Sequence, residues 1–193
     1  AFAGPSGAGK STLVACLLSD ITPDVGQIRL RAQASSGDDE GLALTDVDPT
    51  SWRSAISWVP QSPTLVPGTI LDNMGDLPQR DLDEAARATG FDAVLATTPD
   101  GWNSTIGSGG VGLSVGQRQR LALTRALAAR SQVVVLDEPT AHLDAVSEET
   151  VVRAIHAMRE EGRTVIVIAH RNAIIEVADT IIDVAHADEE ALA

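Results

Sequence analysis

Apolar residues recur along the chain with two spacings, and their alternation predicts an α/β protein. Val133 to Leu136 form a continuous apolar run, which is typical of a strand buried on both faces of a parallel sheet. Thr164 to Ala169 have the same character. Shorter or alternating segments predict further strands at residues 1–3, 27–30, 55–59 and 180–184.

Apolar positions at helical spacing predict the helices between these strands. Val151, Ile155 and Met158 recur at i, i+4 and i+7, in a helix expected to begin near Asp144 and to end before Gly162. Further helices are expected after residue 9 and at 81–88, 91–96, 117–130 and 172–178. We therefore predict a largely parallel sheet covered on both faces, with core residues 1–70 and 131–193 and an inserted helical subdomain at 71–130.

Composition narrows the function classes. The 193 residues are 44% hydrophobic, enough for one core plus a subdomain. A net charge of −13 argues against non-specific binding of nucleic acid, which needs a basic face. The single cysteine, Cys16, cannot form a disulfide framework, and the four histidines lack metal-ligand spacing. No apolar run approaches the roughly 20 residues that cross a bilayer, so we expect any membrane span to lie in another segment or partner.

A phosphate-binding loop follows the first predicted strand. The pattern G-x-x-x-x-G-K-[ST] is complete in Gly4, Pro5, Ser6, Gly7, Ala8, Gly9, Lys10, Ser11 and Thr12. In such a loop the backbone N–H groups surround a β-phosphate, and glycines allow the close approach. We expect Lys10 to neutralise the β and γ phosphate oxygens of a ligand, and Ser11 to offer its hydroxyl to Mg²⁺. The position of the loop predicts that the sequence starts inside a domain.

Two adjacent carboxylates follow the buried strand at 133–136. Asp137 suits Mg²⁺, which is held by one or two protein oxygens together with phosphates. Glu138 can polarise an attacking water as a general base. Asp-Glu pairs commonly cap turns, but the phosphate loop favours the catalytic interpretation.

The string Leu113-Ser114-Val115-Gly116-Gln117 suggests a second anion site at a helix start. Ser114, the Gly116 amide and Gln117 stand where a helix N-terminus can hold a γ-phosphate. This string resembles the L-S-G-G-Q signature of the ATP-binding cassette (ABC) nucleotide-binding domain. The resemblance implies an N-terminally truncated ABC ATPase fold, and it implies that this second site acts on ATP bound to another nucleotide-binding domain in a homodimer or heterodimer.

Other motifs of that family occur in order along nearly the whole chain. Gln61 matches the glutamine that contacts Mg²⁺ and water and joins the core to the helical subdomain. His170 matches the histidine that contacts the γ-phosphate, and residues 141–144 match the loop that crosses the dimer interface. The resemblance therefore assigns catalysis to Glu138, His170 and Gln61, and metal binding to Ser11, Gln61 and Asp137.

The sequence departs from the family at three points. Val115 replaces the first glycine of the signature, and its Cβ is expected to weaken that site. Ser108-Gly109-Gly110 replace a charged motif of exporters that contacts the other subunit. The aromatic residue that stacks on adenine in the family is expected upstream of Ala1.

Residues 52–61 and 67–73 resemble exporters in which membrane and nucleotide domains share one polypeptide. More narrowly, Leu65 to Thr69 and Glu138 to Asp144 resemble the CydD group, one half of the heterodimeric CydDC exporters of cysteine and glutathione linked to cytochrome bd assembly, which implies a CydC-like partner. The expected location is the cytoplasmic face of the bacterial inner membrane. The alternatives are a soluble ABC ATPase of DNA repair or translation and a non-catalytic ATP-binding half of a heterodimer.

Overall fold

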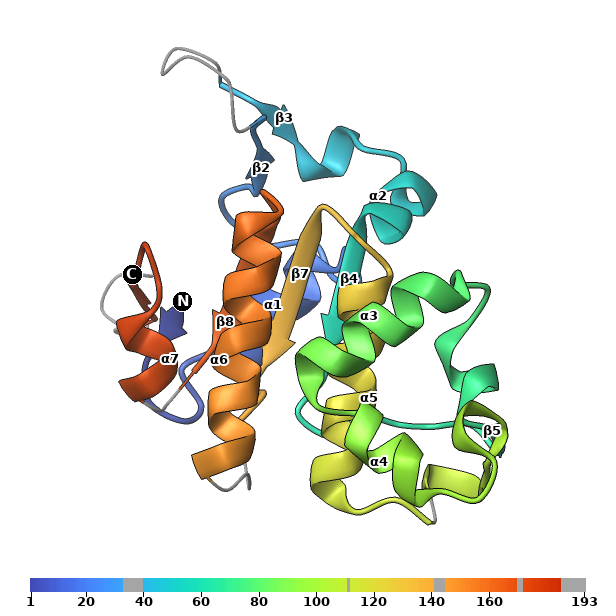
Figure 1. The fold of residues 1–193 in the computed structure, drawn as a ribbon. Coiled ribbons are helices and arrows are strands. Elements are labelled where there is room, and N and C mark those ends of the chain that lie inside the picture. The colour runs from blue at the N-terminus through green and yellow to red at the C-terminus, as the bar shows by residue number, and fades with distance from the viewer. Residues whose placement is uncertain (33–39, 111, 141–144, 170–171, 185–193) are drawn as a thin grey trace.

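A five-stranded parallel sheet forms the centre of the molecule (Figure 1). The computed structural model describes residues 1–32, 40–110, 112–140, 145–169 and 172–184. The strand order is β4-β7-β8-β1-β9, and every neighbouring pair is parallel. The strands are β1 (Phe2–Ala3), β4 (Ile56–Val59), β7 (Val133–Asp137), β8 (Thr164–Ile168) and β9 (Ile182–Asp183).

The apolar run at 133–136 lies in the middle of this sheet. Val134, Val135 and Leu136 of β7 have no exposed surface. Val133 pairs with Thr164 at one end of β7, and Asp137 pairs with Ile168 at the other. Because parallel strands end at the same edge, this register places the carboxylates of Asp137, the last residue of β7, and Glu138, the next residue, beside the end of β8.

Helices cover both faces of the sheet, as the alternating pattern predicted. On one face Val14 of α1 (Lys10–Leu17) packs with Val135 and Ile168. On the other face α5 (Val115–Ala128) and α6 (Ala145–Glu160) pack against Val134 and Leu136. The other helices are α2 (Pro49–Ala55), α3 (Gln79–Thr89), α4 (Asp92–Thr97) and α7 (Asn172–Glu176).

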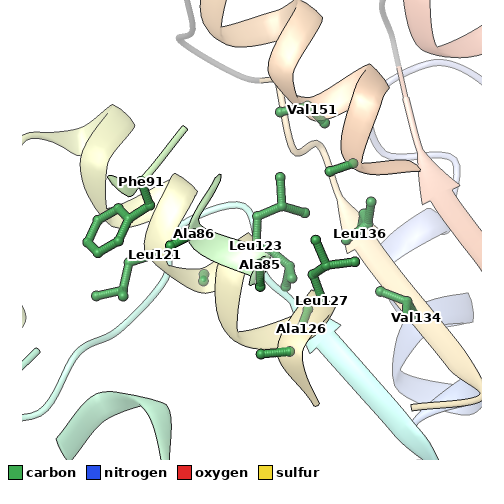
Figure 2. Close-up of a cluster of buried hydrophobic side chains, with 14 of the residues drawn as sticks. Ala85, Ala86, Phe91, Leu121, Leu123, Ala126, Leu127, Val134, Leu136 and Val151 are labelled. Atoms are coloured by element: carbon green, nitrogen blue, oxygen red, sulfur yellow. The ribbon is translucent and has the colours of Figure 1, made fainter. Parts of the chain in front are cut away.

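The helices α3, α4 and α5 lie together to one side of the sheet (Figure 1). Their side chains form one hydrophobic cluster with β7 and α6. Figure 2 shows part of it, with Leu123 and Leu127 of α5 between Ala86 of α3 and Leu136 of β7. A buried hydrogen bond of 2.6 Å joins the hydroxyls of Thr89 and Thr124, so α3 and α5 are held by polar contact as well as by packing.

Short elements complete the chain. Two antiparallel pairs, β2 (Arg29–Leu30) with β3 (Leu42–Ala43) and β5 (Gly68–Thr69) with β6 (Thr105–Ile106), stand apart from the main sheet. Single 3₁₀ turns occupy Leu44–Asp46, Leu71–Met74, Gly101–Asn103 and Ser108–Gly110. No helix within the described ranges is long and apolar enough to cross a membrane.

The predicted fold class is confirmed, and the expected strands and helices are present with shifted ends. The helix α2 was not predicted, although the sequence contains its start signal. Asp48 caps the helix by accepting a hydrogen bond from Ser51 N at 2.8 Å, and Pro49 occupies the first turn. The division at residues 70 and 130 stays a prediction.

Candidate functional site

The loop between β1 and α1 uses its glycines for two different physical reasons. Gly9 caps α1 with φ 90°, a left-handed conformation that favours glycine, and a Cβ there would meet nothing within 4 Å. A Cβ on Gly4, in contrast, would lie 2.3 Å from the carbonyl oxygen of Val184. Gly9 therefore turns the chain into the helix, whereas Gly4 allows β9 to approach the loop.

The start of α1 is open for an anion. No side chain caps this helix end, and its first turn contains no acidic residue. The first N–H groups of a helix have no partner within the helix, and the helix dipole is positive there. In contrast, Asp48 caps α2 and Ser114 caps α5. The loop and α1 thus present donors and positive potential in one direction, which is the arrangement that binds phosphate.

Lys10 adds a formal positive charge to this helix start. The residue is only 7% exposed, and its Nζ donates to the carbonyl oxygens of Gly4 at 2.8 Å and Pro5 at 2.7 Å. An ammonium has three N–H donors, so these two bonds hold Lys10 in the loop and leave one donor for a ligand oxygen.

A cavity of about 230 Å³ joins this loop to the carboxylates at the end of β7. Its size is below the roughly 300–1,000 Å³ of pockets that bury a drug-sized ligand, and it suits phosphate groups better than a whole nucleotide. The lining residues are Ser6, Gly7, Gly9, Lys10, Ser11, Thr12, Asp137, Glu138 and Ile168. The fold therefore brings together the two predicted clusters, although more than a hundred residues separate them in the chain.

A larger hollow of about 440 Å³ lies near Cys16, between the end of α1 and the segment before α2. It is lined by apolar and small polar residues, and none of them carries a charge. We place the site in the smaller cavity because only that one combines an open helix start, a buried ammonium and two carboxylates.

Glu138 is held in an unusual conformation at the end of β7. Its φ of 45° lies in the left-handed region, which costs a non-glycine residue on the order of 1 kcal/mol or more. Its N–H donates to Ile168 O at 3.0 Å, and its Oε2 accepts a hydrogen bond of 2.7 Å from Gln61 Nε2. The neighbouring strand β8 and the segment after β4 thus fix both the backbone and the carboxylate of Glu138.

The oxygen atoms around the cavity fit Mg²⁺. Ser11 and Asp137 both line it, and a hydroxyl with a single carboxylate matches the sparse protein ligation that this ion accepts beside phosphates. Within the described ranges, no group of three or more His, Cys, Asp or Glu residues forms a denser metal site. The metal contact of Gln61 stays a prediction; its amide nitrogen donates to Glu138, and Gln61 is not among the cavity-lining residues.

The second predicted anion site lies at the start of α5, and its residues do not line the cavity. Ser114 N donates to Gln117 Oε1 at 2.8 Å, and Gln117 N donates to Ser114 Oγ at 3.2 Å. This reciprocal capping box gives both side chains a local structural role. Val115 is 55% exposed beside Gly116, so this helix end faces outward. The Ser114 O–H can still donate to an external anion.

Some predicted residues lie outside the described part of the chain, namely His170 and residues 141–144. Two site contacts were not anticipated from the sequence: the bonds from Lys10 to the loop carbonyls and the bond from Gln61 to Glu138. A partial signal for the second existed, because Gln61 and Glu138 each closely follow a predicted strand, and neighbouring parallel strands end at the same edge of a sheet.

Comparisons with known proteins agree with this geometry. The family model described as "ABC transporter" matches residues 1–141. The chain is 37% identical over 186 residues to a multidrug resistance ABC transporter ATP-binding and permease protein of Lactococcus lactis, and 40% identical over 185 residues to an ATP-dependent lipid A-core flippase of Burkholderia pseudomallei. Both matches cover 94% of this chain but only 30% and 29% of the relatives.

A solved structure of a bacterial Atm1-family ABC exporter with ATP bound is similar to the whole described fold. The TM-score is 0.84 at 32% sequence identity, and the match covers 96% of this chain and 31% of that one. The chain therefore spans about a third or less of the length of these proteins.

Proposed function

This chain belongs to the ABC transporter family, and we propose that it is the domain that binds and hydrolyses ATP in a bacterial exporter. The observation that carries the proposal is the cavity that joins the phosphate loop and Lys10 to Asp137 and Glu138. Phosphoryl transfer to water needs an anion cradle, a metal ligand and a group that accepts the proton of the attacking water. This cavity contains all three.

In this mechanism the loop N–H groups and the Lys10 ammonium bind the β- and γ-phosphates of ATP. Ser11 and Asp137 would hold Mg²⁺, which neutralises charge on the phosphate oxygens when bound. Glu138 accepts a proton from water as the water oxygen attacks the γ-phosphorus. The bond from that phosphorus to the bridging oxygen breaks, and ADP and phosphate leave.

Gln61 orients the general base. Its amide donates to Glu138 Oε2 at 2.7 Å, and this bond fixes the direction of the carboxylate before water is positioned. The left-handed φ of Glu138 supports its role as a positioned general base. Strained backbone conformations persist where the surrounding structure imposes them, and they cluster at functional sites. We assign the third catalytic position to His170 on the resemblance alone.

The start of α5 is proposed to act on ATP held by a second nucleotide-binding domain. Its support is geometric, because the outward-facing Ser114, Gly116 and Gln117 do not line the cavity around Lys10. A fused or associated membrane domain completes the exporter, which places this domain on the cytoplasmic face of the bacterial membrane. The L. lactis relative, named as both ATP-binding protein and permease, supports a fused membrane domain.

The narrower assignment is a CydD-like half of a cysteine and glutathione exporter with a CydC-like partner. It rests on the short strings Leu65 to Thr69 and Glu138 to Asp144. The relatives named above bear other names, so the substrate needs its own test. Uptake of labelled glutathione into inverted membrane vesicles containing the full-length protein and its partner should depend on ATP, and a lack of such uptake would leave the exporter assignment intact but remove the substrate.

Glu138→Gln tests the hydrolytic mechanism. We expect turnover in the full-length protein to fall by about 10²-fold or more, because general-base catalysis typically contributes that much. MgATP affinity should stay within about twofold, since the amide keeps the shape of the side chain. The control is Glu160→Gln, which changes an exposed carboxylate on α6. Undiminished turnover in Glu138→Gln would contradict the general-base assignment.

Ser114→Arg tests the second site. Ser114→Arg alone should impair hydrolysis at the phosphate loop of the partner and leave nucleotide binding at Lys10 of the same chain intact. Lys10→Ala on one subunit or the other then shows which phosphate loop the remaining turnover comes from. If Ser114→Arg instead abolishes binding at its own Lys10, the two helix starts form one site and the two-domain arrangement is wrong.

A further inference from the structure

Arg163 is a buried cation that the catalytic mechanism does not use. Its side chain is only 5% exposed and forms an ion pair with Glu161. Its Nη1 donates to Ala126 O at 3.3 Å, and its Nη2 donates to Leu127 O at 2.9 Å. These carbonyls belong to the last turn of α5, and Leu127 O also accepts a hydrogen bond of 3.3 Å from Arg130 N. Arg163 therefore caps the C-terminus of α5 from more than thirty residues away.

The backbone that carries Arg163 is itself fixed. Arg163 N donates to Met158 O at 3.1 Å, which ties it to the end of α6. Thr164 N donates to Gln132 O at 2.9 Å, which ties the start of β8 to the segment before β7. The guanidinium thus extends from the α/β core into the end of a helix that packs with α3 and α4.

We propose that Arg163 is a positioning residue through which the core sets the direction of α5, and thereby the position of Ser114, Val115 and Gly116 at its far end. The inference rests on the proposed function of that end. Small residues make up much of the packing surface of α5, including Ala122, Ala126 and Ala128. Apolar contact is not directional, so two charge-assisted hydrogen bonds from one planar guanidinium define the angle of the helix better than that surface can.

Because α5 is long, a small change in its angle at one end displaces the other end measurably. Eleven residues separate Leu127 from Gly116, which is about 17 Å of helix at 1.5 Å per residue. A tilt of about 2° at Leu127 therefore moves Gly116 by about 0.6 Å. Functional groups need to be placed within about 0.5 Å. A small loss of restraint at Arg163 would therefore displace the start of α5, at Ser114 to Gly116, by more than this tolerance.

A second arginine supports the junction. Arg130, two residues after α5, donates to Asp81 Oδ1 at 3.1 Å and Glu84 Oε2 at 3.3 Å on α3. Arg163 joins α5 to the core, and Arg130 joins the end of α5 to α3. The two contacts restrain the same helix end from both sides.

The test measures the position of the α5 start directly. In the full-length protein without other cysteines, spin labels are placed at Val115→Cys on α5 and at His156→Cys on the exposed side of α6, and the distance distribution between them is recorded without nucleotide. Arg163→Met should shift or broaden this distribution by about 2 Å or more, which corresponds to a tilt of about 7° over the length of α5. The matched control is Arg159→Met, which removes the ion pair with Asp179 on the same side of the core and should leave the distribution unchanged.

The same variants without labels give a functional readout. Turnover per bound nucleotide should fall about threefold to tenfold in Arg163→Met, with the KM for ATP within twofold, because the phosphate loop lies elsewhere. Arg163→Lys should be intermediate in distance and in turnover, since one ammonium does not reproduce the fork of a guanidinium.

An unchanged distance distribution in folded Arg163→Met would overturn the proposal. If that variant does not fold, Arg163→Lys decides, and a wild-type distribution in Arg163→Lys would overturn it. The distance measurement needs no ATP, so a wild-type protein without ATPase activity would count against the proposed function and leave the positioning result standing.

Discussion

Two charged side chains are buried among the described residues, and they lie at opposite kinds of helix end. Lys10 is at the N-terminus of α1, and Arg163 caps the C-terminus of α5. A cation is unfavourable near the positive end of a helix dipole and favourable near the negative end. Arg163 is therefore satisfied within the protein, whereas Lys10 sits where an anion would be favourable.

This difference indicates which buried charge is held for a ligand and which for the fold. Both cations donate to backbone carbonyls, so hydrogen bonding does not separate them. Arg163 has a carboxylate partner in Glu161 as well. Lys10 shares its cavity with Asp137 and Glu138, and in our proposal the phosphates of ATP are the ligand of this cation.

The largest effect that we expect from substituting either buried cation is the loss of ATP binding in Lys10→Met. Removing an ammonium that binds phosphate oxygens should weaken MgATP binding by about 10³-fold, or about 4 kcal/mol, in titration calorimetry of the full-length protein. The melting temperature without nucleotide should fall less than in Arg163→Met, because the lost bonds to the Gly4 and Pro5 carbonyls are offset by removal of a charge from an unfavourable helix end. A decrease in melting temperature as large as that of Arg163→Met would show that both cations stabilise the fold to the same extent.

Arg163→Met should show the reverse pattern. Ala126 O and Leu127 O lose their bonds from the guanidinium, although Leu127 O keeps the bond from Arg130 N, and Glu161 loses its ion pair. We therefore expect a loss of stability of about 2 kcal/mol, or about 5 °C in melting temperature. MgATP affinity should change less than twofold. For comparison, Arg159→Met breaks an exposed ion pair and should cost at most about 1 kcal/mol. Equal losses in the two variants would contradict the buried role of Arg163.

Raising the salt concentration should distinguish Lys10 from Arg163 by a smaller effect. Raising NaCl from about 0.1 M to about 1 M shortens the Debye length from about 10 Å to about 3 Å. MgATP affinity should fall by about threefold to tenfold, because the anion approaches from solvent. The stability difference between wild type and Arg163→Met should change less, since the Arg163 side chain is only 5% exposed, although Glu161 is 39% exposed. Calorimetry and thermal unfolding at the two salt concentrations would check both.

The smallest effect concerns α2, which carries its own anion at its start. Hydrogen bonds from the backbone N–H and the hydroxyl of Ser51 lower the pKa of Asp48 below its usual value of 3.8. The folded pKa lies below the unfolded one, so the contribution of Asp48 to stability is complete above the unfolded pKa and is lost as pH falls through the folded pKa. Thermal unfolding of Asp48→Asn from pH 7 down to about pH 3 should show a smaller acid-dependent loss than wild type. An identical pH profile would show that this cap contributes nothing measurable.

Local patterns in the sequence predicted most of the elements. The apolar run at 133–136 identified a strand buried on both faces, because burial on two sides leaves no place for polar residues. The spacing of Val151, Ile155 and Met158 identified α6, since residues three and four apart share one helix face. The phosphate loop was also predictable from the sequence, because nine consecutive residues contain its donors, its cation and its turns.

The tertiary structure decided which residues meet. Gln61 and Glu138 are 77 residues apart, and their bond depends on the parallel register of β4 and β7, which the sequence does not state. Gly4 was expected to serve a phosphate, but its closest constraint is the carbonyl of Val184. Arg163 appeared in the sequence as an ordinary charged residue between a helix and a strand. It caps a helix only because the fold places the end of α5 beside it. The residues near Arg163 in the sequence do not indicate this contact, because it joins segments that are far apart in the chain.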